Sequence, residues 1–220
     1  MPVVAGVIMF LYMAAVIYGA FVYAPAAEGL GETSRIFFFH VPIAWTAMLA
    51  FLTSLVNSVL VLKNHKIDND IKAEAAARIG LWFTVLATIT GAMWAKAAWN
   101  MYWNWDPREI SIVVLLMIYM AYFGLRSAIT DHDKRMRLSA VYAILAAVMS
   151  VFLVFVVPRV YMSLHPDTII NKHASSQIGD KRILQVFLAS LAGFTALYFW
   201  IYSLAVRVER LVKKKEGFDV

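Results

Sequence analysis

Six long stretches of this sequence contain no Asp, Glu, Lys or Arg. They cover residues 1–27, 36–62, 79–95, 110–125, 138–158 and 183–206. A helix needs about 20 apolar residues to cross the hydrocarbon core of a bilayer, with about 17 near the lower limit. The composition agrees, since 62% of the residues are hydrophobic and only 15% are charged, whereas about 25% are charged in a typical soluble domain.

These stretches predict an all-α polytopic membrane protein, a single six-span domain over residues 1–220. The predicted transmembrane helices are residues 4–24, 41–62, 79–95, 110–126, 138–158 and 183–206. The charged residues are then expected in the loops between spans. Because no charged residue lies in the interior of a predicted span, the usual mark of a proton relay or an ion-coupled transporter is missing. We therefore expect the functional site at a membrane surface.

The basic residues are divided unevenly between the two sides of the predicted membrane. Of 20 Lys and Arg residues, 13 fall on the side that holds both termini and 7 fall on the other side. The positive-inside rule therefore predicts that both termini are cytoplasmic. The tail from Arg207 to Lys215 is interpreted as an anchor to anionic membrane lipid. The net charge of +6 is therefore no indication of a nucleic-acid partner.

Cysteine is absent from the chain, which excludes thiolate metal sites, iron–sulfur clusters and cysteine nucleophiles. Histidine remains for ligand chemistry. The predicted orientation places His40, His165 and His173 on the outer side. His65 and His132 fall among charged cytoplasmic residues and are interpreted as solvated. His173 lies in a polar stretch of a long outer loop and is also interpreted as solvated.

Residues 94–109 are the most unusual stretch of the chain, because four of its seven tryptophans lie there. The four are Trp94, Trp99, Trp103 and Trp105. An interfacial belt would explain tryptophan at headgroup depth, but a belt is normally spread over all helix ends. A flat aromatic shelf followed by Asp106 and Arg108 suits a large planar ligand with carboxylates, because rings pack on flat faces and guanidinium pairs with carboxylate. We expect residues 96–109 to be external.

Two histidines flank predicted spans on this outer side. His40 precedes the second span, with Pro42 at a position that suits a first helical turn. His165 lies just beyond the fifth span, which Pro158 is expected to end or kink. Each histidine alone is a weak signal. Two imidazoles beside an aromatic floor and nearby arginines would together suit an iron porphyrin held by two axial ligands.

This pattern resembles the tryptophan-rich WWD signature of the haem-handling proteins of cytochrome c biogenesis. The matching residues are Trp94, Trp99, Trp103, Trp105 and Asp106, with His40 and His165 at the positions of the paired external histidines. The six-span plan and the length of 220 residues resemble the cytochrome c maturation protein C family. The chain has Ala95 and Asn100 where that family usually has glycine, which would allow close backbone approach to a flat ligand.

The resemblance implies a protein of the bacterial inner membrane, not an enzyme, that holds haem b as transient cargo at its periplasmic face. It implies axial ligation by His40 and His165, porphyrin contact by the five signature residues, and propionate or partner contact by Arg35 and Arg108. The implied recipient is a periplasmic haem chaperone, cytochrome c maturation protein E. Further implied partners are a small single-span subunit, maturation protein D, and the ATP-binding-cassette transporter subunits, maturation proteins A and B.

Two other functions remain as alternatives. A membrane haem oxidoreductase subunit would exchange electrons with quinol, but such proteins usually set their haem-binding histidines within helices, and the middle of the predicted spans contains no histidine. A non-haem anchor subunit of a transporter complex would use the tryptophan cluster only to dock a partner. That protein would be colourless.

Overall fold

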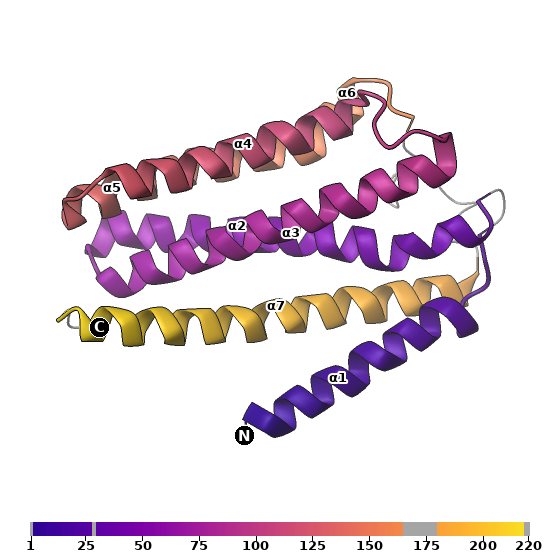
Figure 1. Ribbon diagram of the computed structural model, residues 1–220, viewed down its shortest axis with the longest axis horizontal. Helices are drawn as coiled ribbons and strands as arrows, with labels where there is room; N and C mark the ends of the chain where they lie inside the picture. Colours follow the sequence, from indigo (N-terminus) through magenta and orange to yellow (C-terminus); the bar gives the residue numbers. More distant parts are fainter. Residues whose placement is uncertain (1, 28–29, 165–179, 218–220) are drawn as a thin grey trace.

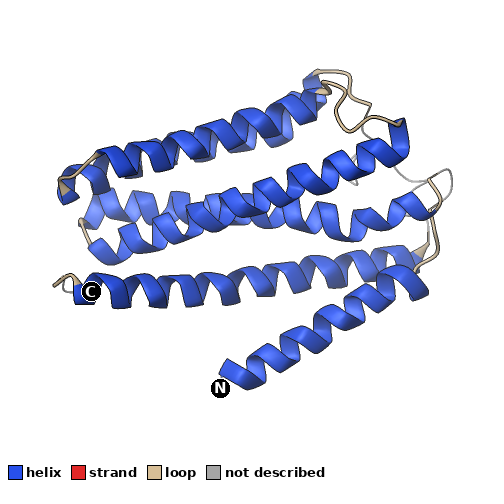
Figure 2. Cartoon of the chain, viewed as in Figure 1, coloured by secondary structure: helices blue, strands red, loops and turns tan. Residues whose placement is uncertain are grey.

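The computed structural model describes residues 2–27, 30–164 and 180–217, and these residues are almost entirely helical (Figures 1 and 2). Within this described part of the chain, six helical segments are long and apolar enough to cross a membrane: Val4–Tyr23, Glu32–Asn64, Ile67–Trp99, Pro107–Ala128, His132–Val160 and Lys181–Lys215. The prediction of an all-α, six-span membrane protein is therefore confirmed.

In chain order the α-helices are α1 (Pro2–Tyr18), α2 (Phe37–Asn64), α3 (Ile67–Trp99), α4 (Pro107–Ala128), α5 (His132–Val151), α6 (Val157–Val160) and α7 (Lys181–Lys215). The described residues also include three short segments of other helix types: η1 (Gly19–Tyr23), η2 (Glu32–Ile36) and η3 (Phe152–Val156). The first extends α1, the second leads into α2, and the third joins α5 to α6.

The helices run side by side along the long axis of the molecule (Figure 1). Helix α2 is central and packs against α3, α5 and α7, while α4 packs against α3 and α5. Helix α1 packs against α7 and diverges from it toward the N-terminus. The ends of η1, α3 and α6 and the starts of α2, α4 and α7 lie at one end of the bundle, on the right in Figure 1, and the start of α1 and the end of α7 lie toward the opposite end.

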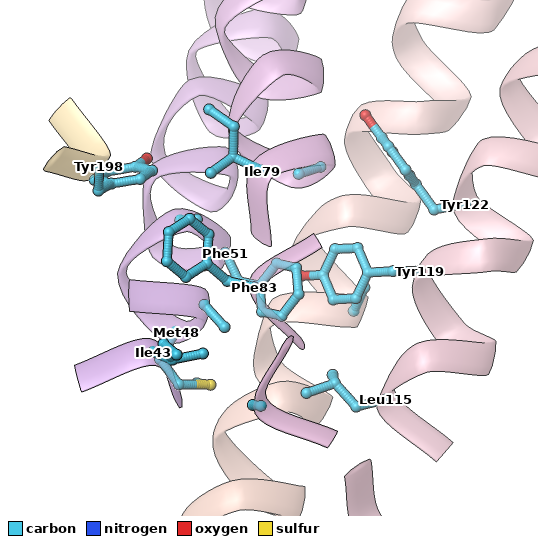
Figure 3. Close-up of a cluster of buried hydrophobic side chains, with 14 of the residues drawn as sticks. Ile43, Met48, Phe51, Ile79, Phe83, Leu115, Tyr119, Tyr122 and Tyr198 are labelled. Carbon is cyan, nitrogen blue, oxygen red and sulfur yellow. The ribbon is translucent and has the colours of Figure 1, made fainter. Parts of the chain in front are cut away.

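The core is formed where α2, α3 and α4 meet (Figure 3). Phe51 of α2 stacks on Tyr119 of α4, with ring centroids 3.7 Å apart. Gly80 of α3 makes room for this pair, because a Cβ atom there would lie 2.4 Å from the Phe51 ring. The close approach of three helices at this point sets the positions of their outer ends.

Pro42 lies inside α2, beyond its first turn, so the expectation that it lies in a first helical turn is wrong. Proline has no N–H to give to the carbonyl four residues earlier. That carbonyl belongs to Phe38, and it accepts a hydrogen bond from the Ser190 hydroxyl of α7. A side chain from another helix thus replaces the missing backbone donor, which lets the helix begin before the proline.

Pro158 lies in α6, directly after the π-type turn of η3, and the helix ends two residues later at Val160. The expectation that Pro158 ends or kinks the fifth span is therefore confirmed. The chain leaves the bundle here toward Ser163 and Leu164, the last described residues before position 165.

At the end of the bundle that holds both termini, several charged residues lie within the ends of helices and pair across helices. The expectation that charged residues lie in loops is wrong for these residues. Arg126 of α4 binds both carboxylate oxygens of Asp70 in α3, at 2.7 and 2.8 Å, and Glu74 at 2.7 Å. The Arg126 and Asp70 side chains are each 8% exposed. Within the predicted lipid anchor, Arg210 of α7 pairs instead with Asp68.

Candidate functional site

The tryptophan-rich segment begins in α3 and crosses to α4. Helix α3 ends at Trp99, and Asn100 follows with a left-handed backbone, φ 61°. Trp94 and Trp99 contact edge to face at a centroid distance of 4.8 Å and an interplanar angle of 75°. Trp103 and Trp105 do the same at 5.9 Å and 85°. The expected flat shelf is therefore wrong in its geometry, because each pair presents two perpendicular rings.

A pocket of about 360 Å³ opens beside the first tryptophan pair. It is lined by Leu30, Thr33, Trp94, Ala97, Ala98, Trp99 and Leu164. The volume falls within the range of small-molecule sites, roughly 300–1,000 Å³. Three connections or helix ends contribute to it, so it forms only when the outer ends of the bundle come together. Trp103 and Trp105 are not in the lining, and Trp105 is 74% exposed.

His40 lies in the first turn of α2 and faces α3. Its Nδ1 atom is 2.8 Å from the Thr90 hydroxyl oxygen. A Cβ atom at Gly91 would come within 3.1 Å of the His40 ring, so glycine lets the imidazole lie close to the α3 backbone. Thr90 precedes Trp94 by four residues, and residues with this spacing share one face of a helix. The residue that His40 contacts therefore lies one helical turn from Trp94, which lines the pocket.

Arg108 lies in the first turn of α4, and the starts of α2 and α4 lie at the same end of the bundle (Figure 1). Three expected site residues thus lie at this end of three helices: His40 at the start of α2, Trp94 near the end of α3 and Arg108 at the start of α4. His65 and His132 lie at the end of α2 and at the start of α5, at the terminal end of the bundle. The other expected ligand, His165, lies outside the described residues, as does His173.

Asp106 is only 5% exposed, and its carboxylate faces the protein. It caps α4 by accepting from the Arg108 N–H at 2.9 Å. It also accepts from the Ser163 hydroxyl at 2.9 Å and from the Leu164 N–H at 2.7 Å. Asp106 therefore ties the start of α4 to the segment that follows α6. Asp106 was expected in a surface that contacts the ligand, whereas its carboxylate binds groups of the protein itself.

Arg35, expected at a propionate or a partner, also binds its own chain. Its guanidinium donates to the carbonyls of Ala20 and Ala24, at 2.6 and 3.1 Å, and pairs with Glu32. These contacts join the end of η1 to the start of the second span. Arg35 thus organises the α1–α2 connection, which supplies Leu30 and Thr33 to the pocket.

Sequence reasoning missed the residues that support the site. Thr90 and Gly91 carry a weak signal, since they lie four and three residues before Trp94 on one helix face. Ser163 and Leu164 carry none, because their contact with Asp106 spans 57 and 58 residues of sequence. Only the packing of α4 beside α6 brings these segments together.

The fold and the site define a class: a six-span helical membrane protein with a tryptophan-lined pocket at one end of its bundle. A family model described as Heme exporter protein C matches residues 1–219, and the chain belongs to this family. The resemblance stated from the sequence is therefore confirmed.

Individual relatives carry the same description. The Heme exporter protein C of Rhodobacter capsulatus is 29% identical over 219 residues, covering 100% of this chain and 90% of the relative. That of Bradyrhizobium diazoefficiens is 30% identical over 198 residues, covering 90% and 74%. That of Escherichia coli K12 is 31% identical over 128 residues, covering 58% and 52%.

Proposed function

We propose that this protein binds haem b as transient cargo at the tryptophan-rich end of its bundle and delivers it to a partner during the maturation of c-type cytochromes. Membership of the heme exporter protein C family supports a role in haem transport. The observation that carries the proposal is the contact of the His40 imidazole with Thr90, a residue one helical turn from Trp94 in the lining of the pocket.

The potential metal-ligating side chains of the described residues fit an iron porphyrin. A porphyrin supplies four equatorial nitrogens, so the protein needs to add only axial ligands. Within residues 2–27, 30–164 and 180–217 no three His, Asp or Glu side chains gather as a metal site, and the pocket is lined mostly by apolar and aromatic residues. We assign axial ligation to His40 and His165, and porphyrin contact to Trp94 and Trp99.

The remaining residues of the segment have more peripheral roles in this proposal. Arg108 offers a cation to a propionate, while Asp106 and Arg35 hold the surrounding connections in place. Trp105 exposes most of its surface, and with Trp103 it offers an aromatic contact to a docking partner. The proposed recipient is a periplasmic haem chaperone, with the single-span and ATP-binding-cassette subunits as further partners. The proposed location is the bacterial inner membrane, with the pocket at its periplasmic face.

An absorption spectrum of the detergent-purified protein tests the proposal. We expect a Soret band in the wild type that shifts or weakens in His40→Ala and in His165→Ala. His65→Asn and His132→Ala are matched controls from the terminal end of the bundle, and we expect both to retain the wild-type spectrum. A colourless wild type, even after expression with ample haem and without the chaperone, would favour the anchor function instead.

A further inference from the structure

Thr90 connects the His40 ring to the backbone of α3. Its hydroxyl lies 2.8 Å from the Leu86 carbonyl oxygen and 3.2 Å from that of Ala87. Donation to an earlier carbonyl is the usual hydrogen bond of threonine in a helix. A hydroxyl has one proton to give, so the Thr90 oxygen acts toward His40 as an acceptor. The 2.8 Å contact with Nδ1 is then a hydrogen bond donated by the ring.

The geometry points to Thr90 as a positioning residue that holds His40 in the tautomer with its proton on Nδ1. In a neutral imidazole with Nδ1 protonated, Nε2 carries the lone pair that a metal requires. The inference rests on the proposed function, since it names the residue that prepares His40 for haem iron. Histidine ligands of metals ordinarily donate their second N–H to an oxygen, which fixes the ring and raises its basicity.

Gly91 determines how closely the His40 ring approaches α3. The hydrogen bond to Thr90 sets the rotation of the imidazole. Because Gly91 has no side chain, the ring can lie close to the α3 backbone; a Cβ atom at position 91 would be only 3.1 Å from Cε1 of His40. The imidazole is therefore held by one polar contact and one close steric contact from consecutive residues. Such a constraint keeps Nε2 in one direction while cargo arrives and leaves.

Three variants test the role of the hydroxyl. Thr90→Val removes it at nearly constant shape, and Thr90→Ser retains it. Thr88→Val is the matched control, because the Thr88 hydroxyl bonds to Thr84 O within the same helix. Each full-length protein is titrated with hemin in detergent, and the midpoint potential of the bound haem is measured. Circular dichroism verifies the fold of each variant.

We expect Thr90→Val to bind hemin about tenfold more weakly, since loss of such an outer-shell partner typically costs 10–100-fold in metal affinity. We also expect its midpoint potential to rise, because a less basic imidazole stabilises ferric iron less. Thr90→Ser should restore both values, and Thr88→Val should match the wild type. Equal values for Thr90→Val and the wild type, no recovery in Thr90→Ser, or the same change in Thr88→Val would each overturn the inference.

A second measurement needs neither haem nor a folded Thr90 variant. Nitrogen-15 spectra of the wild-type protein labelled at histidine report which ring nitrogen carries the proton, and the His40→Ala spectrum identifies the His40 signals. We expect protonated Nδ1 and unprotonated Nε2, and the opposite tautomer would overturn the inference.

The two proposals fail in different ways. A wild type that binds no hemin removes the proposed function. A wild type that binds hemin and loses it in His40→Ala, with Thr90→Val unchanged, removes only the role of Thr90.

Discussion

Asn100 illustrates how one residue can be misread without its helix. It follows the end of α3 with a left-handed backbone, and its N–H bonds to the Lys96 carbonyl at 3.0 Å. Glycine is the usual residue at such a position and asparagine the next. A helix cap therefore accounts for the asparagine here, and it would equally accommodate the glycine that the resemblance led us to expect. Close approach to a flat ligand is not needed to explain this position.

Asp106 leads to a prediction about the segment after α6. Asp106→Ala removes the α4 cap, which typically costs about 1 kcal/mol, and also frees Ser163 and Leu164 from the start of α4. Because Leu164 lines the pocket and directly precedes His165, we expect haem retention to fall several-fold. The measurement is the haem-to-protein ratio after gel filtration.

Asp131→Ala is the matched control for this prediction. Asp131 caps α5 by accepting from the Lys134 N–H at 2.8 Å, and it lies at the other end of the bundle. We expect a similar loss of thermal stability with normal haem retention. Equal haem retention in both variants would show that Asp106 is a helix cap and nothing more.

The start of α2 depends on α7, because the Ser190 hydroxyl of α7 donates a hydrogen bond to the Phe38 carbonyl. In Ser190→Ala the Phe38 carbonyl loses its donor, and an unsatisfied buried group costs about 1–3 kcal/mol. In the double variant Pro42→Ala, Ser190→Ala, the backbone N–H of residue 42 returns as a donor. We therefore expect the double variant to be more stable than Ser190→Ala alone, as measured by denaturant unfolding in detergent.

Ser203→Ala is the control on the same helix, since its hydroxyl bonds to Trp200 within α7. We expect a change within about 0.5 kcal/mol, as for substitutions away from special contacts. If the double variant is instead as unstable as the sum of its single changes, the two residues are not coupled through Phe38.

The helices could be predicted from the sequence because long charge-free stretches have one stable form in a bilayer. Their ends could not be predicted in the same way. Helix α3 begins at Ile67, twelve residues before the predicted span, because Asp70 and Glu74 find Arg126 on another helix. The site follows the same pattern: His40 and Trp94 carry a chemical signal, whereas Thr90 and Ser163 are ordinary residues whose roles arise from packing.

The orientation of the whole molecule is a prediction that a chain without cysteine makes easy to test. Met162 is 98% exposed at the pocket end, and Lys66 is exposed at the terminal end. We expect a membrane-impermeant maleimide to label Met162→Cys in intact spheroplasts and Lys66→Cys only after lysis. The wild type, with no cysteine, gives the background. The reverse pattern would place the termini outside.

The ion pairs at the end of the bundle that holds both termini join residues that are made at different times during synthesis. Asp70 and Glu74 enter the membrane environment with α3, before Arg126 at the end of α4 has been made, and Glu209 follows with α7 to pair with Arg78. On the predicted orientation, Arg126 and Arg78 each help to retain a loop on the cytoplasmic side, because acidic residues, including the neighbouring Glu74 of α3, contribute little to that choice. Each arginine links two helices only once both helices have been made. Each of these arginine side chains thus serves first as a topological signal during membrane insertion and then as an ion-pair link between helices of the folded protein.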